Sequence, residues 1–224
     1  MTEHISVLSR EAVEGLALKK GDTVFDATLG GGGHTAEICK KIGHEGILIG
    51  VDLDEEALRR AKEKTIGSDC TTNFIKENFR NLDAVLEKEG ISKIDKALFD
   101  LGMSSFELET SGRGFSFKRD EPLLMTFDSD PNYGSLTAGE IVNEWTEEDI
   151  TRVLREYGEE RFAKQIAKTI VDRREAKKIE RSGELAEIVN ASIPARFRRG
   201  DSPVKTFQAL RIAVNDELEA LKEG

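Results

Sequence analysis

The sequence lacks the features of a membrane protein, of a secreted protein and of a protein stabilised by structural zinc. Its only cysteines, Cys39 and Cys70, and its histidines, His4, His34 and His44, are too few and too scattered for a structural zinc site. Two lone cysteines favour reduced, buried thiols in a cytoplasmic protein. No apolar run approaches the roughly 20 residues of a membrane helix, and the first residues lack the pattern of a signal peptide. We expect a cytoplasmic protein with no metal and no membrane partner.

Positive charge is also scarce, because 43 acidic residues outnumber 33 basic ones and give a formal net charge of −10. With 38% hydrophobic residues among 224, the composition is typical of a globular chain of one or two domains. The basic residues concentrate in the window 161–205, where twelve of them stand against six acidic ones. This window is either a solvated helical face or a phosphate-binding surface.

Short apolar runs alternate with helical patterns over the first hundred residues. Because parallel strands are connected by helical crossovers, this alternation predicts a doubly wound α/β sheet. The expected strands are 23–27, 47–52, 72–75 and 96–100, and the expected helices are 35–42, 55–65 and 82–89.

After the fourth expected strand the alternation stops. Residues 102–145 are rich in Gly, Ser, Asp and Pro, which predicts a long functional loop. Three helices are expected beyond it: one capped by Thr146 and ended by Gly158, one over 159–175, and one capped by Ser182.

We therefore divide the chain into three parts. Residues 1–104 form the first part of an α/β domain, and residues 105–203 form an inserted helical domain for RNA or substrate recognition. Residues 204–224 are expected to return to the α/β domain as a helix.

The segment 26–34, Asp-Ala-Thr-Leu-Gly-Gly-Gly-Gly-His, joins the first expected strand to the first expected helix. Glycine is needed where the backbone takes positive φ or approaches a ligand closely. A dinucleotide fingerprint would need a small residue in place of Thr35, and a phosphate loop would need a lysine in place of His34. An acid four residues before Gly-x-Gly fits the first motif of S-adenosylmethionine-dependent methyltransferases, with Thr28 at a position that is commonly glycine.

Three later strand ends carry candidate ligand groups. Asp52 can accept hydrogen bonds from both hydroxyls of an adenosine ribose, which suits NAD and S-adenosylmethionine alike. Phe79 follows the third strand and either covers an adenine or packs in the core. Asp100 ends the fourth strand. All three are expected at the carboxyl edge of the sheet, where open α/β folds bind ligands.

Six segments of the chain carry a resemblance to a known family: 26–34, 52–54, 100–105, 113–117, 157–163 and 206–215. In this order, they resemble the MraW (RsmH) family, the ribosomal RNA small subunit methyltransferases H. The resemblance covers essentially the whole chain. It implies a class I methyltransferase fold with an inserted all-α domain, and S-adenosylmethionine-dependent N4-methylation of a cytidine in the decoding region of 16S rRNA. The implied partner is that rRNA or the assembled small subunit, and a homodimer stays open.

The resemblance also implies a cofactor site. The two glycines before His34 hold the methionine end of the cofactor together with that histidine, Asp52 takes the ribose, and Phe79 lies near the adenine. The family usually has glutamine at the position of Glu107. The implied cofactor-binding residues are Gly32, Gly33, His34, Asp52, Phe79, Asp100 and Glu107.

Methyl transfer to an exocyclic amine is an in-line displacement that depends mostly on positioning. A hydrogen-bond acceptor near N4 would hold the rotated amine and relay its proton. Asp100 is the candidate catalytic residue, with cofactor contact alone as the alternative.

The segment 113–119 supplies aromatic rings for stacking and cations for phosphates. The alternative is that Phe115 and Phe117 pack into the core. The predicted RNA contacts are Arg113, Phe115, Arg119 and Lys205.

The chain departs from the family pattern in two further places. Leu124 and Thr126 replace an acid and an arginine of a Pro-Leu-Asp-Met-Arg-Met-Asp segment, which puts the role of that pair in doubt. Related chains continue beyond Gly224 into further strands, so this sheet is expected to lack its last strands and expose an apolar edge. A non-catalytic rRNA-binding or assembly module, or an inactive fragment, is therefore the alternative to an enzyme. An NAD-dependent oxidoreductase is disfavoured by Thr35.

Overall fold

The structure is a computed structural model that describes residues 9–103, 108, 110–129 and 135–224. The chain forms two compact units. The α/β unit comprises Met1–Ser104, Asp128–Asp130 and Glu219–Gly224, and the helical unit comprises Ser105–Phe127 and Pro131–Leu218.

The α/β unit is built on a parallel sheet with the strand order β3-β2-β1-β4. Asp26, the last residue of β1, lies level with Gly50 on one neighbour and Leu98 on the other. The predicted α/β fold is confirmed, and the strand order reverses beside β1, which is where such sheets bind ligands. The strands are β1 (Thr23–Asp26), β2 (Ile47–Asp52), β3 (Thr71–Lys76) and β4 (Lys96–Leu98).

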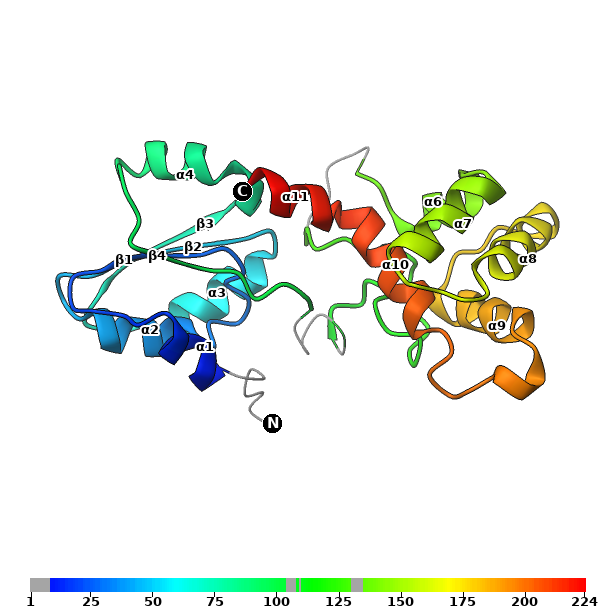
Figure 1. The fold of residues 1–224 in the computed structure, drawn as a ribbon, viewed down its shortest axis with the longest axis horizontal. Coiled ribbons are helices and arrows are strands. Elements are labelled where there is room, and N and C mark those ends of the chain that lie inside the picture. The colour runs from blue at the N-terminus through cyan, green and yellow to red at the C-terminus, as the bar shows by residue number, and fades with distance from the viewer. Residues whose placement is uncertain (1–8, 104–107, 109, 130–134) are drawn as a thin grey trace. The chain divides into compact units, whose positions relative to one another are not determined.

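Helices cover both faces of this sheet, with α4 on one side and α1, α2 and α3 on the other (Figure 1). The alternation of side chains along the strands explains why. Val24 and Leu48 pack with Ile38 of α2, whereas their neighbours in sequence, Phe25 and Ile49, point to the α4 side. All five are wholly buried, and each such burial stabilises by about 1.5–3 kcal/mol. The helices are α1 (Ser9–Gly15), α2 (Thr35–Ile42), α3 (Glu55–Lys64) and α4 (Leu82–Lys88).

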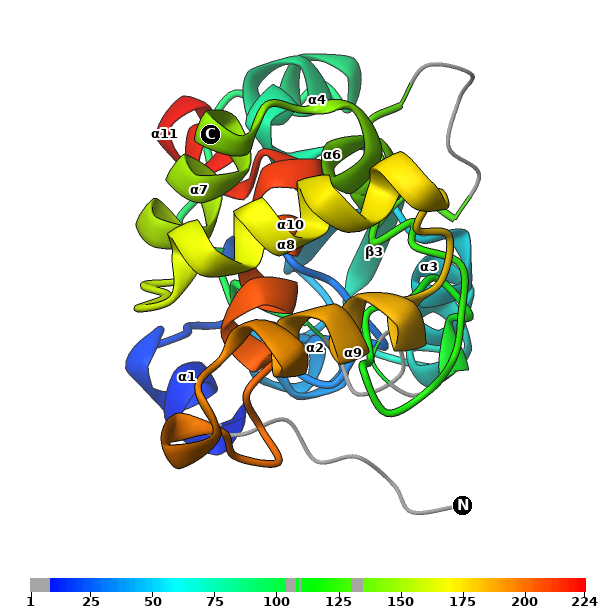
Figure 2. The same cartoon turned by 90° about the vertical axis from the view of Figure 1, so that its right-hand side faces the viewer.

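The helical unit packs α8 against both α7 and α9, while α10 packs against α6 and α7. Helices α8 and α9 lie side by side in both views (Figures 1 and 2). The core of the helical unit contains the wholly buried Leu154, Ile166, Ile170 and Leu185. The helices are α6 (Ala138–Glu144), α7 (Glu147–Glu156), α8 (Ala163–Ala176), α9 (Ser182–Ser192) and α10 (Val204–Asn215). The segment α11 (Glu217–Glu223) follows α10.

Helix α6 corrects the prediction of a continuous loop over 102–145. A reciprocal capping box starts it: the Thr137 hydroxyl accepts from the backbone N–H of Glu140, and the Glu140 carboxylate accepts from the N–H of Thr137. The helix has only seven residues and contains Gly139. It is therefore too short to show a clear apolar stripe in a Gly- and Asp-rich context.

Helix α10 departs from the division that assigned 204–224 to the α/β domain. Its buried Phe207 and Leu210 belong to a helix that packs on α6 and α7, and only Glu219–Gly224 fall in the α/β unit. The apolar stripe of a helix shows that it is covered on one side. It does not show which neighbour covers it.

Of the two helix caps predicted in this unit, one is confirmed and one is wrong. Thr146 caps α7 by accepting from the N–H of Asp149 at 3.1 Å. Ser182, the predicted cap of α9, is instead its first helical residue, and its hydroxyl donates to the carbonyl of Arg119 and accepts from the N–H of Glu121.

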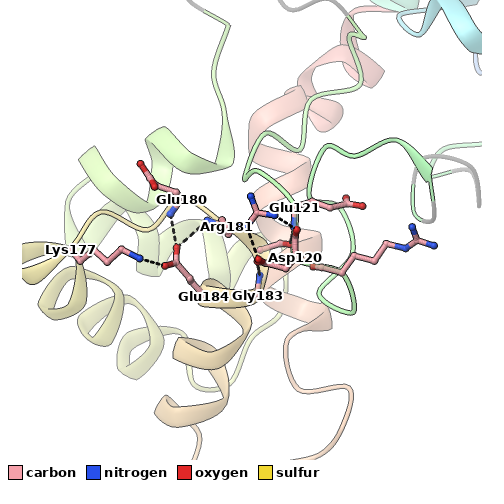
Figure 3. Close-up of polar contacts among 9 residues, drawn as sticks. Asp120, Glu121, Lys177, Glu180, Arg181, Gly183 and Glu184 are labelled. Carbon is pink, nitrogen blue, oxygen red and sulfur yellow. Dashed lines mark hydrogen bonds and ion pairs between the residues drawn. The ribbon is translucent and has the colours of Figure 1, made fainter.

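A polar network holds the segment 119–121 against the start of α9 (Figure 3). The Asp120 carboxylate accepts from Nε of Arg181 at 2.6 Å and from the N–H of Gly183 at 3.2 Å. Glu184 accepts from the backbone N–H groups of Glu180 and Arg181. Together with the Ser182 hydroxyl, which bonds to the backbone of Arg119 and Glu121, the network fixes the backbone on either side of Asp120.

The two cysteines form a disulfide between Cys39 of α2 and Cys70, with Cα atoms 5.1 Å apart. The prediction of reduced thiols is therefore wrong for this structure. The two residues are 31 positions apart, and only the packing of α2 on the sheet next to the start of β3 makes them neighbours.

Candidate cofactor site

The glycine loop between β1 and α2 has a conformation that its glycines make accessible. Gly30 and Gly32 take φ values of +50° and +70°. A Cβ atom on Gly32 would lie 2.8 Å from Cα of Ala61 in α3, so only glycine fits there. The loop continues through the exposed Gly33 to His34, and α2 begins at Thr35. Its first turn supplies backbone N–H groups at the carboxyl edge of the sheet.

Asp52 ties this loop to the end of β2. Its Oδ2 accepts from the N–H of Gly30 at 2.8 Å, and its Oδ1 accepts from the N–H of Asp54 at 2.9 Å. These bonds hold a half-buried carboxylate beside the glycine loop.

His34 and Asp100 meet across the end of β4. Nε2 of the buried His34 lies 3.2 Å from Oδ2 of Asp100, whose side chain is 55% exposed. The backbone N–H of Asp100 donates to the Thr28 hydroxyl at 2.8 Å. Thr28, which stands at a commonly glycine position, thus links the glycine loop to the segment that carries Asp100.

Asp26 lies wholly buried at the end of β1. Burial disfavours its charged form and raises the pKa of its carboxyl to about 6. The N–H of Thr28, which donates to Oδ1 at 3.1 Å, and the nearby His34 partly oppose that rise, while Asp52 and Asp100 add to it.

Three buried polar atoms of this loop have no hydrogen-bond partner among the residues that the structure describes. They are Oδ2 of Asp26, Nδ1 of His34 and Oγ1 of Thr35. Buried polar groups are nearly always paired, so this cluster can be completed by a ligand that both donates and accepts hydrogen bonds. In the described part of the chain, no group of three or more His, Cys, Asp or Glu side chains could hold a metal ion.

Phe79 lies at the start of the 3-10 helix η1 (Phe79–Asn81), and of the two roles left open for it the structure shows packing in the core. Its ring meets Phe99 edge-on at 5.7 Å between centroids and packs against the core around Val85. The side chain is only half-buried, so part of the ring is available to a ligand. Glu107, the remaining predicted cofactor residue, lies outside the described residues.

Two predicted RNA contacts turn out to be internal. Arg113 is buried and donates to the carbonyl of Phe127 at 2.6 Å. Phe115 is also buried, and its ring stacks on Phe127 at 5.7 Å with the Arg113 guanidinium 5.6 Å above it. The structure thus corrects the prediction that Arg113 and Phe115 contact RNA, since neither can present its side chain to a nucleotide.

The other two predicted RNA contacts, Arg119 and Lys205, are exposed. The Arg119 carbonyl is held by Ser182, and Nζ of Lys205 donates to the Glu159 carbonyl at 3.0 Å. Both stay candidates for phosphate binding.

Asn215 is a structural residue whose role the sequence did not reveal. Its side chain accepts from the N–H of Phe127 at 2.7 Å and donates to the carbonyl of Met125 at 2.8 Å. Met125 is buried at a left-handed φ of 55°, so Asn215 holds a strained turn. Thr126, one of the two replaced family positions, is buried within that turn.

The chain is similar to known methylases over its whole length. The family description "MraW methylase family" matches residues 1–224. A ribosomal RNA small subunit methyltransferase H from Clostridium botulinum is 44% identical over 223 residues, which cover 99% of this chain and 71% of that protein. Its counterpart from Symbiobacterium thermophilum is 47% identical over 223 residues, which cover 99% of this chain and 69% of that protein. A solved rRNA methylase from Streptococcus thermophilus has 25% identity and a TM-score of 0.35, covering 46% of this chain and 57% of that one.

Among the helices of the described residues, none combines the length and apolar character needed to cross a bilayer.

Proposed function

Because this chain belongs to the MraW methylase family, we propose that it methylates small-subunit rRNA at N4 of a cytidine in the decoding region. The proposal is supported by the names of its curated relatives and, above all, by one observation. The glycine loop, Asp52 and the His34–Asp100 pair come together at the carboxyl edge of the sheet.

The residues at that edge fit S-adenosylmethionine, the cofactor of this methyltransferase family. The methionine end offers an ammonium donor and a carboxylate acceptor, which match the unpaired buried atoms of Asp26, His34 and Thr35. Gly32 and Gly33 let the backbone approach that end closely. Bound there, the cofactor supplies an electrophilic methyl on a sulfonium.

The adenosine end is assigned to two further residues. Asp52 would accept hydrogen bonds from the ribose hydroxyls, and the exposed part of the Phe79 ring would cover the adenine. Asp52 is the last residue of β2, and Phe79 comes shortly after β3.

Asp100 is assigned as the acceptor for the target amine. Its exposed carboxylate can accept an N–H of the cytosine amino group and so turn the N4 lone pair toward the methyl. As N4 takes up the methyl group that the bound cofactor would supply, Asp100 would accept the proton that N4 loses. His34, 3.2 Å away, orients the carboxylate.

Calorimetric titration with S-adenosylhomocysteine, with NAD as the control ligand, tests the cofactor site. Transfer of a labelled methyl group to unmethylated small subunits and to bare rRNA then tests the reaction and identifies the preferred substrate. We expect selective binding of S-adenosylhomocysteine and labelling confined to a cytidine. Binding without any transfer would favour a non-catalytic rRNA-binding module, and preference for NAD would contradict the cofactor assignment.

A further inference from the structure

Two arginines and two phenylalanines gather on the helical unit, where residues just before α8 meet the 3-10 helix η2 (Ala195–Phe197). We call Arg161, Phe162, Arg196 and Phe197 the Arg–Phe cluster. The two rings are 5.6 Å apart between centroids. The Arg161 guanidinium lies 4.9 Å from the Phe197 centroid and 5.6 Å from that of Phe162, and the Arg196 guanidinium lies 4.8 Å from Phe197. The cations are thus held against aromatic faces.

The cluster faces solvent. Both arginines are exposed, and Phe197 is one of the large hydrophobic side chains with more than a third of its surface accessible. Because the arginines lie against the rings rather than extending freely, their orientation is restricted before any ligand arrives.

Neither arginine of the cluster pairs with a carboxylate among the described residues, although other exposed cations of the same unit do. Arg152 lies 2.8 Å from Asp149, and Lys168 lies 3.3 Å from Asp172. The positive charge of the cluster is therefore uncompensated, in a chain whose net charge is −10.

Further cations adjoin the cluster. Arg198 and Arg199 follow η2 directly and are exposed. Lys205 is tethered to the carbonyl of Glu159, two residues before Arg161. The acids nearest in sequence are the buried Glu160 and the exposed Glu159 and Asp201, so basic groups predominate at the surface.

We propose that the Arg–Phe cluster is a binding surface for single-stranded RNA. Bases stack on the exposed ring of Phe197 and on the guanidinium planes, while the guanidinium N–H groups bind phosphates. Stacking favours RNA over an anionic membrane surface, because lipid headgroups have no flat aromatic face to match the rings. This inference rests on the proposed function, since rRNA is the substrate that would occupy the surface.

The test is binding of a labelled single-stranded RNA of roughly 20 nucleotides, measured by fluorescence anisotropy over a range of salt concentrations. For the double variant Arg161→Ala/Arg196→Ala we expect at least tenfold weaker binding at about 0.1 M salt. We also expect a salt dependence shallower by roughly 0.7 for each lost phosphate contact. Phe197→Ala should weaken binding by about tenfold, and Phe197→Tyr should retain it.

Arg152→Ala is the matched control, because it removes an exposed but ion-paired arginine from the same unit. It should leave RNA affinity unchanged. Unchanged affinity in the double variant would overturn the proposal. So would a double variant that lost affinity only for vesicles containing anionic lipid.

Methyl transfer measured on the same proteins separates this inference from the proposed function. If the double variant binds RNA normally and the wild type transfers methyl groups, only the Arg–Phe cluster is refuted. If the wild type transfers no methyl group but the double variant loses RNA binding, the cluster stands and the proposed reaction fails.

Discussion

The two units differ in what their buried polar groups do. In the helical unit, the buried Arg113, Glu160 and Ser182 have hydrogen-bond partners within the unit. Among the described side chains of that unit, only Oγ1 of Thr206 is buried without one. In the α/β unit, the unpaired buried atoms of Asp26, His34 and Thr35 gather around one loop. Since folding normally pairs such atoms, the gathering of three of them around one loop supports the proposal that a ligand binds there. In the helical unit, the comparable groups lie at the surface. They are the arginines of the Arg–Phe cluster, which pair with no carboxylate among the described residues.

The largest expected effect is a loss of methyl transfer, in a variant in which both units stay folded. Asp100→Asn keeps the shape of the side chain but removes its charge, so methyl transfer should fall by roughly 10²–10⁴-fold while S-adenosylhomocysteine affinity changes little. Single-turnover kinetics and calorimetry measure the two quantities. Normal turnover with weakened cofactor binding would show that Asp100 only contacts the cofactor.

Removing the ribose-binding carboxylate should affect the cofactor site alone. Asp52→Ala loses charged hydrogen bonds and the tie to Gly30, so we expect S-adenosylhomocysteine binding to weaken by about 1–3 kcal/mol. Calorimetry measures the change, with the exposed Asp83→Ala on α4 as the control. Wild-type affinity in the Asp52 variant would refute the ribose assignment.

Two arginines from one segment of the helical unit separate internal packing from surface exposure. Arg113→Ala should lower the free energy of unfolding by about 1–3 kcal/mol, because it leaves buried partners unsatisfied. Arg119→Ala should change it by less than about 0.5 kcal/mol. Urea unfolding checks both values, and equal effects would contradict the difference in burial.

The buried carboxyl of Asp26 gives the α/β unit a specific pH dependence. Its pKa is raised to about 6 in the folded state, so the folded protein binds the proton more tightly and loses stability as pH rises from about 4 to above 6. Asp26→Asn does not titrate. Relative to the wild type, it should gain about 1–2 kcal/mol of unfolding free energy between about pH 5 and about pH 8. A pH-independent difference between the two proteins would contradict the burial effect.

The sequence was most informative where backbone chemistry is local. The glycines on either side of 35–42 and the continuous apolar run 47–52 predicted α2 and β2 with the bounds they have in the structure. The strand ends then placed Asp52 and Asp100 at a shared edge, because parallel strands end together.

It was least informative where one residue type serves two purposes. An Arg-Gly-Phe segment suits RNA stacking and internal packing equally, and only Phe127 and Asn215, brought in from elsewhere in the chain, decide that Phe115 is buried. The Arg–Phe cluster could not be predicted from the sequence for the converse reason. Phe162 and Phe197 are 35 positions apart and meet only through the packing of α8 and α9.

We propose that the α/β unit binds the cofactor while the helical unit binds RNA. The most direct test measures both affinities, each without the other ligand, in Asp52→Ala and in Arg161→Ala/Arg196→Ala. We expect the first variant to lose S-adenosylhomocysteine affinity and keep RNA affinity, and the second to do the reverse. Either variant weakening both affinities to the same extent would contradict this division of binding between the two units.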